Sequence, residues 1–396
     1  MLLNHVRLIG ELSGGAAAED GAVEIKDGKI SQVYEQAVTG EPEGFDDEMI
    51  DCRGKTLLPG LIDAHTHLIG IRYFTSEMMH DPMKLFMKTA DVSMRYLDYG
   101  FTTLRDCGTP LRVANYVRDA FASGLMTGPK IISGGHIISP TEIEEADNIY
   151  HMYKWADGAD ETRKAVRKEL AEHADFVKIM ASGSAFHKQG IPVQPIITEE
   201  EIKTAVDAAA LKDAYVAAHA HGDGAIRLCV ESGVRTIEHA SFISDETIEL
   251  VVDTKDCYLV PTLSAMYQNP AQTPPEMEFL LEKLKNMLEL TSRRIKRAYE
   301  AGLKLGFGTD STVGMDQYEE GIEFRFRSQL CGMKNVDILL QATKYNAEIM
   351  GIENETGEIK AGLAADLILV DGKPDQDISA MYRKPEMVFM NGERVR

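Results

Sequence analysis

Hydrophobic and polar positions follow two alternating patterns through the middle of the chain. Short apolar runs with period-two alternation, typical of strands, are separated by amphipathic stretches such as "EEEIKTAVDAAALKD", typical of helices. The predicted strands are "GLIDAHTHL", "FTTLRDCG", "KIISGGH", "DFVKIMASG", "AYVAAHAHG", "RTIEHAS", "CYLVPTLS" and "LKLGFGTDS". Eight strands, most of them followed by a helix, predict a TIM (β/α)8 barrel. A doubly wound open sheet is the alternative, but it usually has fewer strands and a Gly-rich nucleotide-binding turn, which this chain lacks.

Both ends of the chain have a different pattern, with short strand-like pieces separated by turns. "IKDGKI" near the start and "FMNGERV" near the end each place a hairpin dipeptide, Asp-Gly or Asn-Gly, between strand-like residues. We therefore expect two domains: a small β-sandwich formed by residues 1–58 plus 355–396, and a barrel formed by the residues between them, 59–354. A long loop is expected over 137–160, after the third barrel strand.

The predicted strand "DFVKIMASG" contains one residue that its pattern does not explain. Both faces of the strand are apolar except at Lys178, as in a parallel strand covered on both sides. A lysine is almost never fully buried unless it is paired or modified. Lys178 is therefore expected to have a chemical role.

Other polar residues also fall at the ends of predicted barrel strands. His65 and His67 are two apart, so they share a face of the first strand. The fourth, fifth, sixth and eighth strands end with Lys178, His219, His239 and Asp310. Alone, each has an ordinary explanation, such as a satisfied core histidine or a helix cap. Because the carboxyl ends of barrel strands meet, four imidazoles and a carboxylate there predict a site for a metal such as zinc.

Lys178 fits this metal centre if its amine is neutral. Burial and nearby cations lower the pKa of a lysine, and a neutral amine adds carbon dioxide to form a carbamate that is long enough to bridge two metals. We therefore predict that Lys178 is N6-carboxylated and that the site is binuclear. A Schiff-base lysine is the rival hypothesis. It leaves the four histidines unexplained.

The amino-acid composition argues against nucleic-acid and membrane partners. The chain of 396 residues has 63 acidic against 42 basic side chains, which argues against a nucleic-acid partner. Its five cysteines are scattered without a CxxC pair, as expected for reduced thiols in a cytoplasmic protein. No apolar run approaches the ~18 to 20 residues of a membrane helix. We expect a cytoplasmic protein with neither nucleic-acid nor membrane partners.

The motifs "GLIDAHTHL", "VKIMASG", "AAHAHG", "IEHAS" and "GTDS", with the closing "TGEIKAGLAADLILVDGKP", resemble the metal-dependent amidohydrolase superfamily over nearly the whole chain. The chain looks most similar to the branch of Xaa-Pro dipeptidases and Xaa-Arg/Lys carboxypeptidases, which includes ochratoxin-type amidases. Imidazolonepropionase is a relative, but such enzymes generally use one metal and lack the bridging lysine. Enzymes of this type act on small molecules or dipeptides and commonly form homo-oligomers.

The resemblance also implies a role for each motif residue. His65, His67 and Asp310 would hold the more buried metal, and His219 and His239 the more exposed one. Carboxylated Lys178 and a hydroxide would bridge the two ions. The hydroxide would attack the scissile carbonyl, and Asp310 would pass its proton to the leaving amine.

Two further histidines are candidates for substrate binding. His136 in "SGGHIIS" matches a substrate-facing segment of the family, and His221 follows His219 on the same strand. Either could contact a substrate carboxylate, or could only support the ligands. Arg105 and Asp106 resemble the family's "RD" and are expected to form an internal ion pair.

The predicted function is a binuclear metal-dependent amidohydrolase that cleaves an amide bond of a dipeptide or an N-acyl amino acid. The alternative is a hydrolase of cyclic amides, imidazolones or lactones with the same site. A non-catalytic scaffold is the third hypothesis, and it is disfavoured because every ligand position is filled.

Overall fold

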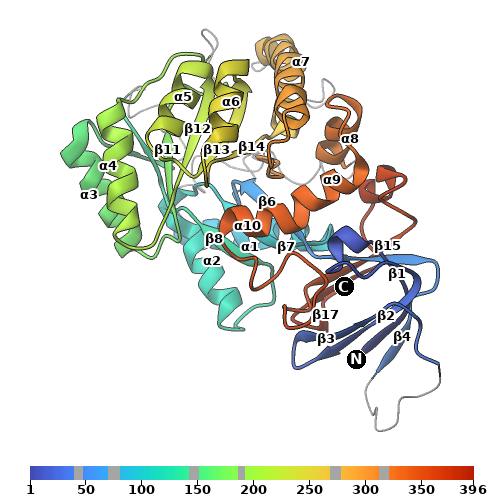
Figure 1. Cartoon of the computed structure of the whole chain (residues 1–396). Helices are drawn as coiled ribbons and strands as arrows, with labels where there is room; N and C mark the ends of the chain where they lie inside the picture. Colours follow the sequence, from blue (N-terminus) through green and yellow to red (C-terminus); the bar gives the residue numbers. More distant parts are fainter. Residues whose placement is uncertain (40–47, 70–80, 142–150, 186–191, 268–277, 312–320) are drawn as a thin grey trace.

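A sheet built from both ends of the chain lies beside a parallel α/β region in the computed structural model (Figure 1). The structure describes residues 1–39, 48–69, 81–141, 151–185, 192–267, 278–311 and 321–396. In Figure 1 the blue and dark red terminal strands gather at the lower right, away from the green and yellow helices.

The terminal sheet has the order β17-β16-β15-β5-β1-β2-β3, with β4 also paired with β1. Its strands are β1 (Leu2–Leu8), β2 (Ala18–Lys26), β3 (Lys29–Tyr34), β4 (Met49–Asp51), β5 (Lys55–Pro59), β15 (Leu367–Asp371), β16 (Met387–Met390) and β17 (Glu393–Arg394). Both predicted hairpins are present: Asp27-Gly28 and Asn391-Gly392 have positive φ at both positions, as a type I′ turn requires. Leu3, Val23, Leu57, Leu367 and Phe389 share one buried cluster, so the two termini share a core.

Two parallel sheets form the rest of the strand framework. The first has the order β6-β7-β8 and the second β10-β9-β11-β12-β13-β14. Their strands are β6 (Leu61–Thr66), β7 (Phe101–Asp106), β8 (Lys130–Ser133), β9 (Ile137–Ser139), β10 (Tyr153–Trp155), β11 (Val177–Met180), β12 (Val216–Gly222), β13 (Thr236–Phe242) and β14 (Tyr258–Val260). The expectation of a loop throughout 137–160 is wrong, because β9 and β10 extend the second sheet beyond β11. The apolar letters of "HIIS" and "YKW" are too few for the pattern to indicate a strand.

Backbone hydrogen bonds connect the two sheets at both sides. On one side, Asp175 N–H, two residues before β11, donates to Ser133 O of β8 across 2.8 Å. On the other side, Gly306 N–H donates to Leu259 O of β14 and Ala64 N–H of β6 donates to Phe307 O. The segment 305–311 therefore lies between β14 and β6.

The segment 305–311 is where an eighth regular strand was predicted, and that detail is wrong. Only isolated bridges, Leu259↔Leu305 and Thr66↔Ser311, occur there. The backbone leaves the extended conformation at Asp310, whose φ is 49°. The segment also packs closely on β6, because a Cβ on Gly308 would lie 2.8 Å from His65 Cβ. The glycine lets the backbone approach β6 closely, which positions the following Asp310.

Helices follow most of the parallel strands, as the alternating pattern predicted. They are α1 (Pro82–Asp98), α2 (Val113–Ala122), α3 (Gly158–Ala171), α4 (Glu199–Ala210), α5 (Asp223–Glu231), α6 (Asp245–Asp253), α7 (Glu278–Glu300), α8 (Ile322–Gln329), α9 (Asn335–Leu340) and α10 (Asn346–Met350). Side chains fix several starts: Asp81 caps α1, and Thr198 forms a capping box with Glu201 in α4. No helix within the described ranges is both long and apolar enough to span a bilayer.

Candidate active site

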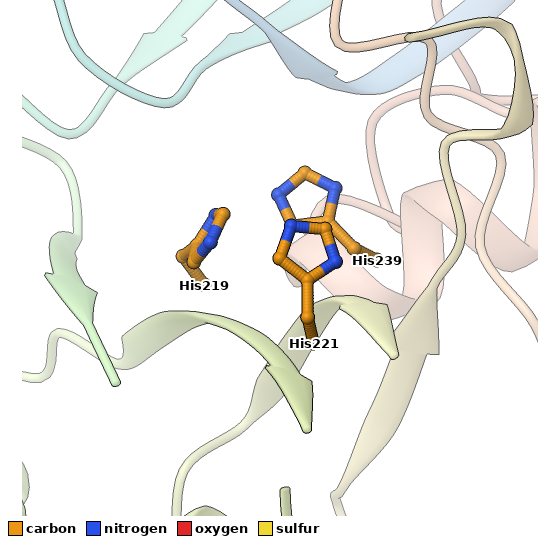
Figure 2. Close-up of side chains that lie close together, drawn as sticks. All are labelled: His219, His221 and His239. Carbon is orange, nitrogen blue, oxygen red and sulfur yellow. The ribbon is translucent and has the colours of Figure 1, made fainter. Parts of the chain in front are cut away.

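The histidines predicted at strand ends do come together. His65 lies in β6 and His67 directly after it, His219 and His221 lie in β12, and His239 lies in β13; all are at most 8% exposed. Figure 2 shows the rings of His219, His221 and His239 close together above the ends of their strands. The ring centroids of His219 and His239 are 4.6 Å apart, and those of His65 and His239 are 4.9 Å apart.

Asp310 joins this cluster from the segment 305–311. Its Oδ1 lies 3.6 Å from His65 Nε2 and 3.4 Å from His67 Nε2, and its Oδ2 lies 3.9 Å from His239 Nδ1. His239 and Asp310 both have positive φ, 71° and 49°, a conformation that costs a non-glycine residue about 1–3 kcal/mol. Such strain persists only where the surrounding structure maintains it, and it is concentrated at functional sites.

Hydrogen bonds at the far side of each ring decide which nitrogen remains available. His67 Nδ1 lies 2.8 Å from Gly108 O, and His219 Nε2 lies 3.2 Å from Gly183 O. A carbonyl oxygen only accepts, so these nitrogens carry the proton and leave His67 Nε2 and His219 Nδ1 as lone-pair donors.

His221 and His239 are held differently. His221 Nδ1 is 2.8 Å from Ser241 Oγ, and His239 Nδ1 is 2.7 Å from Thr262 Oγ1. A hydroxyl can donate or accept, so either tautomer is compatible with these contacts. His221 is therefore free to present an N–H to a ligand, which the two carbonyl-bound histidines are not.

The electrostatics of the cluster favour neutral rings. Burial lowers the pKa of His67 to about 4 and that of His221 to about 3, and the positive charge of Lys178 contributes to both. The pKa values of His65, His219 and His239 also fall well below the usual range, chiefly through burial. A neutral imidazole is the form that binds a metal.

Two buried atoms in the middle of the cluster have no hydrogen-bond partner among the described residues: His65 Nε2 and Asp310 Oδ1. Buried polar atoms are nearly always paired, so such atoms call for an explanation. Groups that fit one cation are His65–His239–Asp310 and His219–His221–His239, each with ligand atoms within 4.8 Å of one another. Nitrogen and carboxylate donors around unpaired atoms fit a divalent metal.

Lys178 lies beside this cluster on β11 and is 1% exposed. In the pairing of β11 with β12, Lys178 lies opposite Ala217, and Met180 lies opposite His219. Lys178 is thus two residues from the position paired with His219. Its charge acts on the pKa of His65, His67 and Asp310. Within the described part of the chain, no carboxylate forms an ion pair with it. A buried lysine without a countercharge is costly, which makes a modified amine physically reasonable.

His136 lies outside the ring cluster, in the loop between β8 and β9. Its Nδ1 lies 3.3 Å from both carboxylate oxygens of Glu169 in α3, and Arg112 binds the same carboxylate at 2.7 and 2.9 Å. The loop runs beside Lys178, because a Cβ on Gly134 would lie 3.4 Å from Lys178 Cβ. His136 is thus held near the cluster without being one of its ligands.

The predicted ion pair between Arg105 and Asp106 is wrong, and the residue that does pair with Arg105, Glu238, was not predicted. Arg105 Nη2 binds Glu238 at 2.8 Å, whereas Asp106 accepts from Leu68 N–H and the Ser133 hydroxyl. Adjacent residues of a strand point to opposite faces, so Arg105 and Asp106 do not meet. The signal that singled out Lys178, a charge within an otherwise apolar strand, applied equally to Glu238 in "TIEHAS".

Residues 56–395 match the model of the Amidohydrolase family. The chain therefore belongs to this family and is an enzyme of the hydrolase class, which confirms the resemblance inferred from its motifs.

Among curated proteins, the chain is similar to ochratoxinase of Aspergillus niger, with 27% identity over 364 residues covering 85% of this chain and 74% of the relative. Among solved structures, it is similar to a Xaa-Pro dipeptidase with bound methionine in the active site, at 28% identity and a TM-score of 0.86, covering 100% of this chain and 99% of the other. A prolidase complexed with N-methylphosphonate-L-proline, also 28% identical, has a TM-score of 0.87 over the same shares.

Proposed function

We propose that this enzyme is a binuclear metal-dependent amidohydrolase that cleaves the amide bond of a dipeptide or an N-acyl amino acid. The observation that carries the proposal is the buried cluster in which His65 Nε2 and Asp310 Oδ1 lie 3.6 Å apart, neither of them with a hydrogen-bond partner among the residues that the structure describes. The similarity to a prolidase and a Xaa-Pro dipeptidase supports the choice of substrate class. The organisation proposed with it is a closed (β/α)8 barrel over 59–354 and a sandwich of 1–58 plus 355–396.

In this proposal His65, His67 and Asp310 would hold one ion, and His219 and His239 would hold the other. Lys178, carboxylated by addition of carbon dioxide to its neutral amine with loss of one proton, supplies a further anionic ligand. When bound, divalent ions such as zinc make hydroxide available near neutral pH and polarise a carbonyl oxygen.

The protein's own groups then move the proton and hold the substrate. Asp310 takes the proton of the attacking water and returns it to the leaving nitrogen, which departs as an amine. His136, fixed by Glu169, and His221, free to donate an N–H, contact the carboxylate of the leaving residue.

A substrate panel tests the proposal. Zinc-loaded enzyme is incubated with dipeptides and N-acyl amino acids whose C-terminal residue is Pro, Arg, Lys, aliphatic or aromatic, and the released amino acid is quantified against the Asp310→Asn protein. We expect release from at least one class. No release from any substrate, with metal bound, would contradict the proposal and favour cyclic amides or lactones.

His136→Asn and His221→Asn are expected to raise KM about 10- to 100-fold for substrates with a free carboxylate, the size of one charged hydrogen bond. Kinetics on a substrate and its C-terminal amide, with metal content measured in parallel, check this. The effect should be much smaller on the amide, and metal content should not change. If His221→Asn instead loses metal, His221 is a third nitrogen ligand of the His219–His221–His239 group.

A further inference from the structure

Glu238 is a fully buried carboxylate at the edge of the candidate metal site, and no ligand role is assigned to it. It lies in β13, next to His239, with 0% exposure. Its Oε2 lies 2.6 Å from His65 Nδ1, and its Oε1 accepts from Arg105 Nη2 at 2.8 Å and from the Thr236 hydroxyl at 2.6 Å. Both oxygens therefore have partners.

Arg105 supplies the countercharge that a buried carboxylate needs. The guanidinium is also fully buried, lies over the Phe176 ring at 5.3 Å, and donates its Nε–H to Ala64 O. Ala64 immediately precedes His65, so Arg105 ties the backbone beside His65 to the carboxylate that binds its ring. The three side chains come from three strands, β6, β7 and β13.

This arrangement decides the tautomer of His65. A carboxylate paired with an arginine is an acceptor, so the proton of His65 resides on Nδ1 and the lone pair on Nε2. Nε2 is the unpaired atom 3.6 Å from Asp310 Oδ1. We infer that Glu238, held by Arg105, is a positioning residue that presents His65 Nε2 to the metal; this inference rests on the proposed function.

A role for Glu238 as a direct metal ligand is less consistent with its contacts. His65, Cys107 and Glu238 also offer ligand atoms within 4.8 Å of one another. His65 Nδ1 and Glu238 Oε2 are already bonded to each other, however, and both Glu238 oxygens are in use. The positioning role therefore predicts no additional ion at Cys107.

Glu238→Gln tests the inference. A glutamine has one acceptor oxygen and cannot accept from both His65 and Arg105, so one of those contacts is lost. We expect the zinc Kd, measured by competition with a chromophoric chelator, to weaken about 10- to 100-fold, as for other groups that orient metal ligands. The Tm of the metal-free variant monitors folding.

Glu169→Gln is the matched control for this experiment. Glu169 is likewise buried, paired with an arginine and in contact with a histidine Nδ1, that of His136, but His136 is outside the ligand groups. Its zinc Kd should remain that of the wild type. Equal zinc affinity in Glu238→Gln and wild type would overturn the inference. If the wild type itself binds no metal, the proposed function fails instead.

The tautomer of His65 can also be measured in the wild type, without a substitution that could destabilise the fold. Nitrogen-15 spectra of the histidine rings in the metal-free wild type, with His65 assigned by its loss in His65→Asn, report the tautomer directly. We expect the proton on Nδ1. A proton on Nε2 would overturn the inference even if Glu238→Gln did not fold.

Discussion

Asp310→Asn is expected to lower kcat by about 10²- to 10⁴-fold, the range for loss of a general acid–base group, while the protein keeps much of its metal. The asparagine still offers an oxygen at the position of Oδ1, 3.4 Å from His67 Nε2 and 3.6 Å from His65 Nε2. It cannot accept the proton of the attacking water. Steady-state kinetics together with metal analysis check both halves of the prediction.

Asp366→Asn is a suitable control for that variant. Asp366 is also buried, at 6% exposure, but it accepts from Asn391 N–H at the terminal sheet. Its replacement should change Tm more than kcat. An unchanged kcat in Asp310→Asn would refute the proton-transfer role of Asp310.

Lys178→Ala is expected to lose most of its bound metal, and its kcat should fall about 10³-fold or more. The reason is that the metal would no longer stabilise the transition state by several kcal/mol, and each 1.4 kcal/mol changes the rate about tenfold. The variant leaves a space where the carbamate would lie. Short-chain carboxylates such as formate or acetate should therefore restore part of both metal content and activity, whereas the matched amides should not.

Lys203→Ala, at an exposed position of α4, should behave as the wild type. In the wild type, carbon-13 bicarbonate should yield a carbamate resonance that Lys178→Ala lacks. Borohydride trapping of a carbonyl substrate on Lys178 would instead establish the rival Schiff-base hypothesis.

Much of the candidate site follows from sequence because its signals are local. A histidine pair two residues apart shares a strand face, and strand ends of a parallel sheet converge, so His65, His67, His219 and His239 could be placed together without coordinates. Lys178 was identified because a charge interrupts an apolar strand. Asp310 was found although its segment is not a regular strand, since "GTDS" still follows the last apolar run.

The contacts that hold these residues in place could not be predicted from the sequence in the same way. Arg105 and Glu238 are 133 positions apart, and which of several buried charges pair depends on strand register across the sheet. Likewise, whether a ring nitrogen faces a carbonyl or a hydroxyl depends on loops such as the one carrying Gly108. Strand β9 pairs with β11, and β10 pairs with β9; these are tertiary contacts that three-residue segments do not reveal.

The most direct test of the account is a metal titration of the chelator-treated enzyme. Zinc is added in known increments, bound metal is measured, and hydrolysis of the best substrate from the panel is followed in the same samples. We predict no activity without metal and a maximum at about two equivalents, as expected for a two-metal site. Full activity in the metal-free enzyme would contradict it.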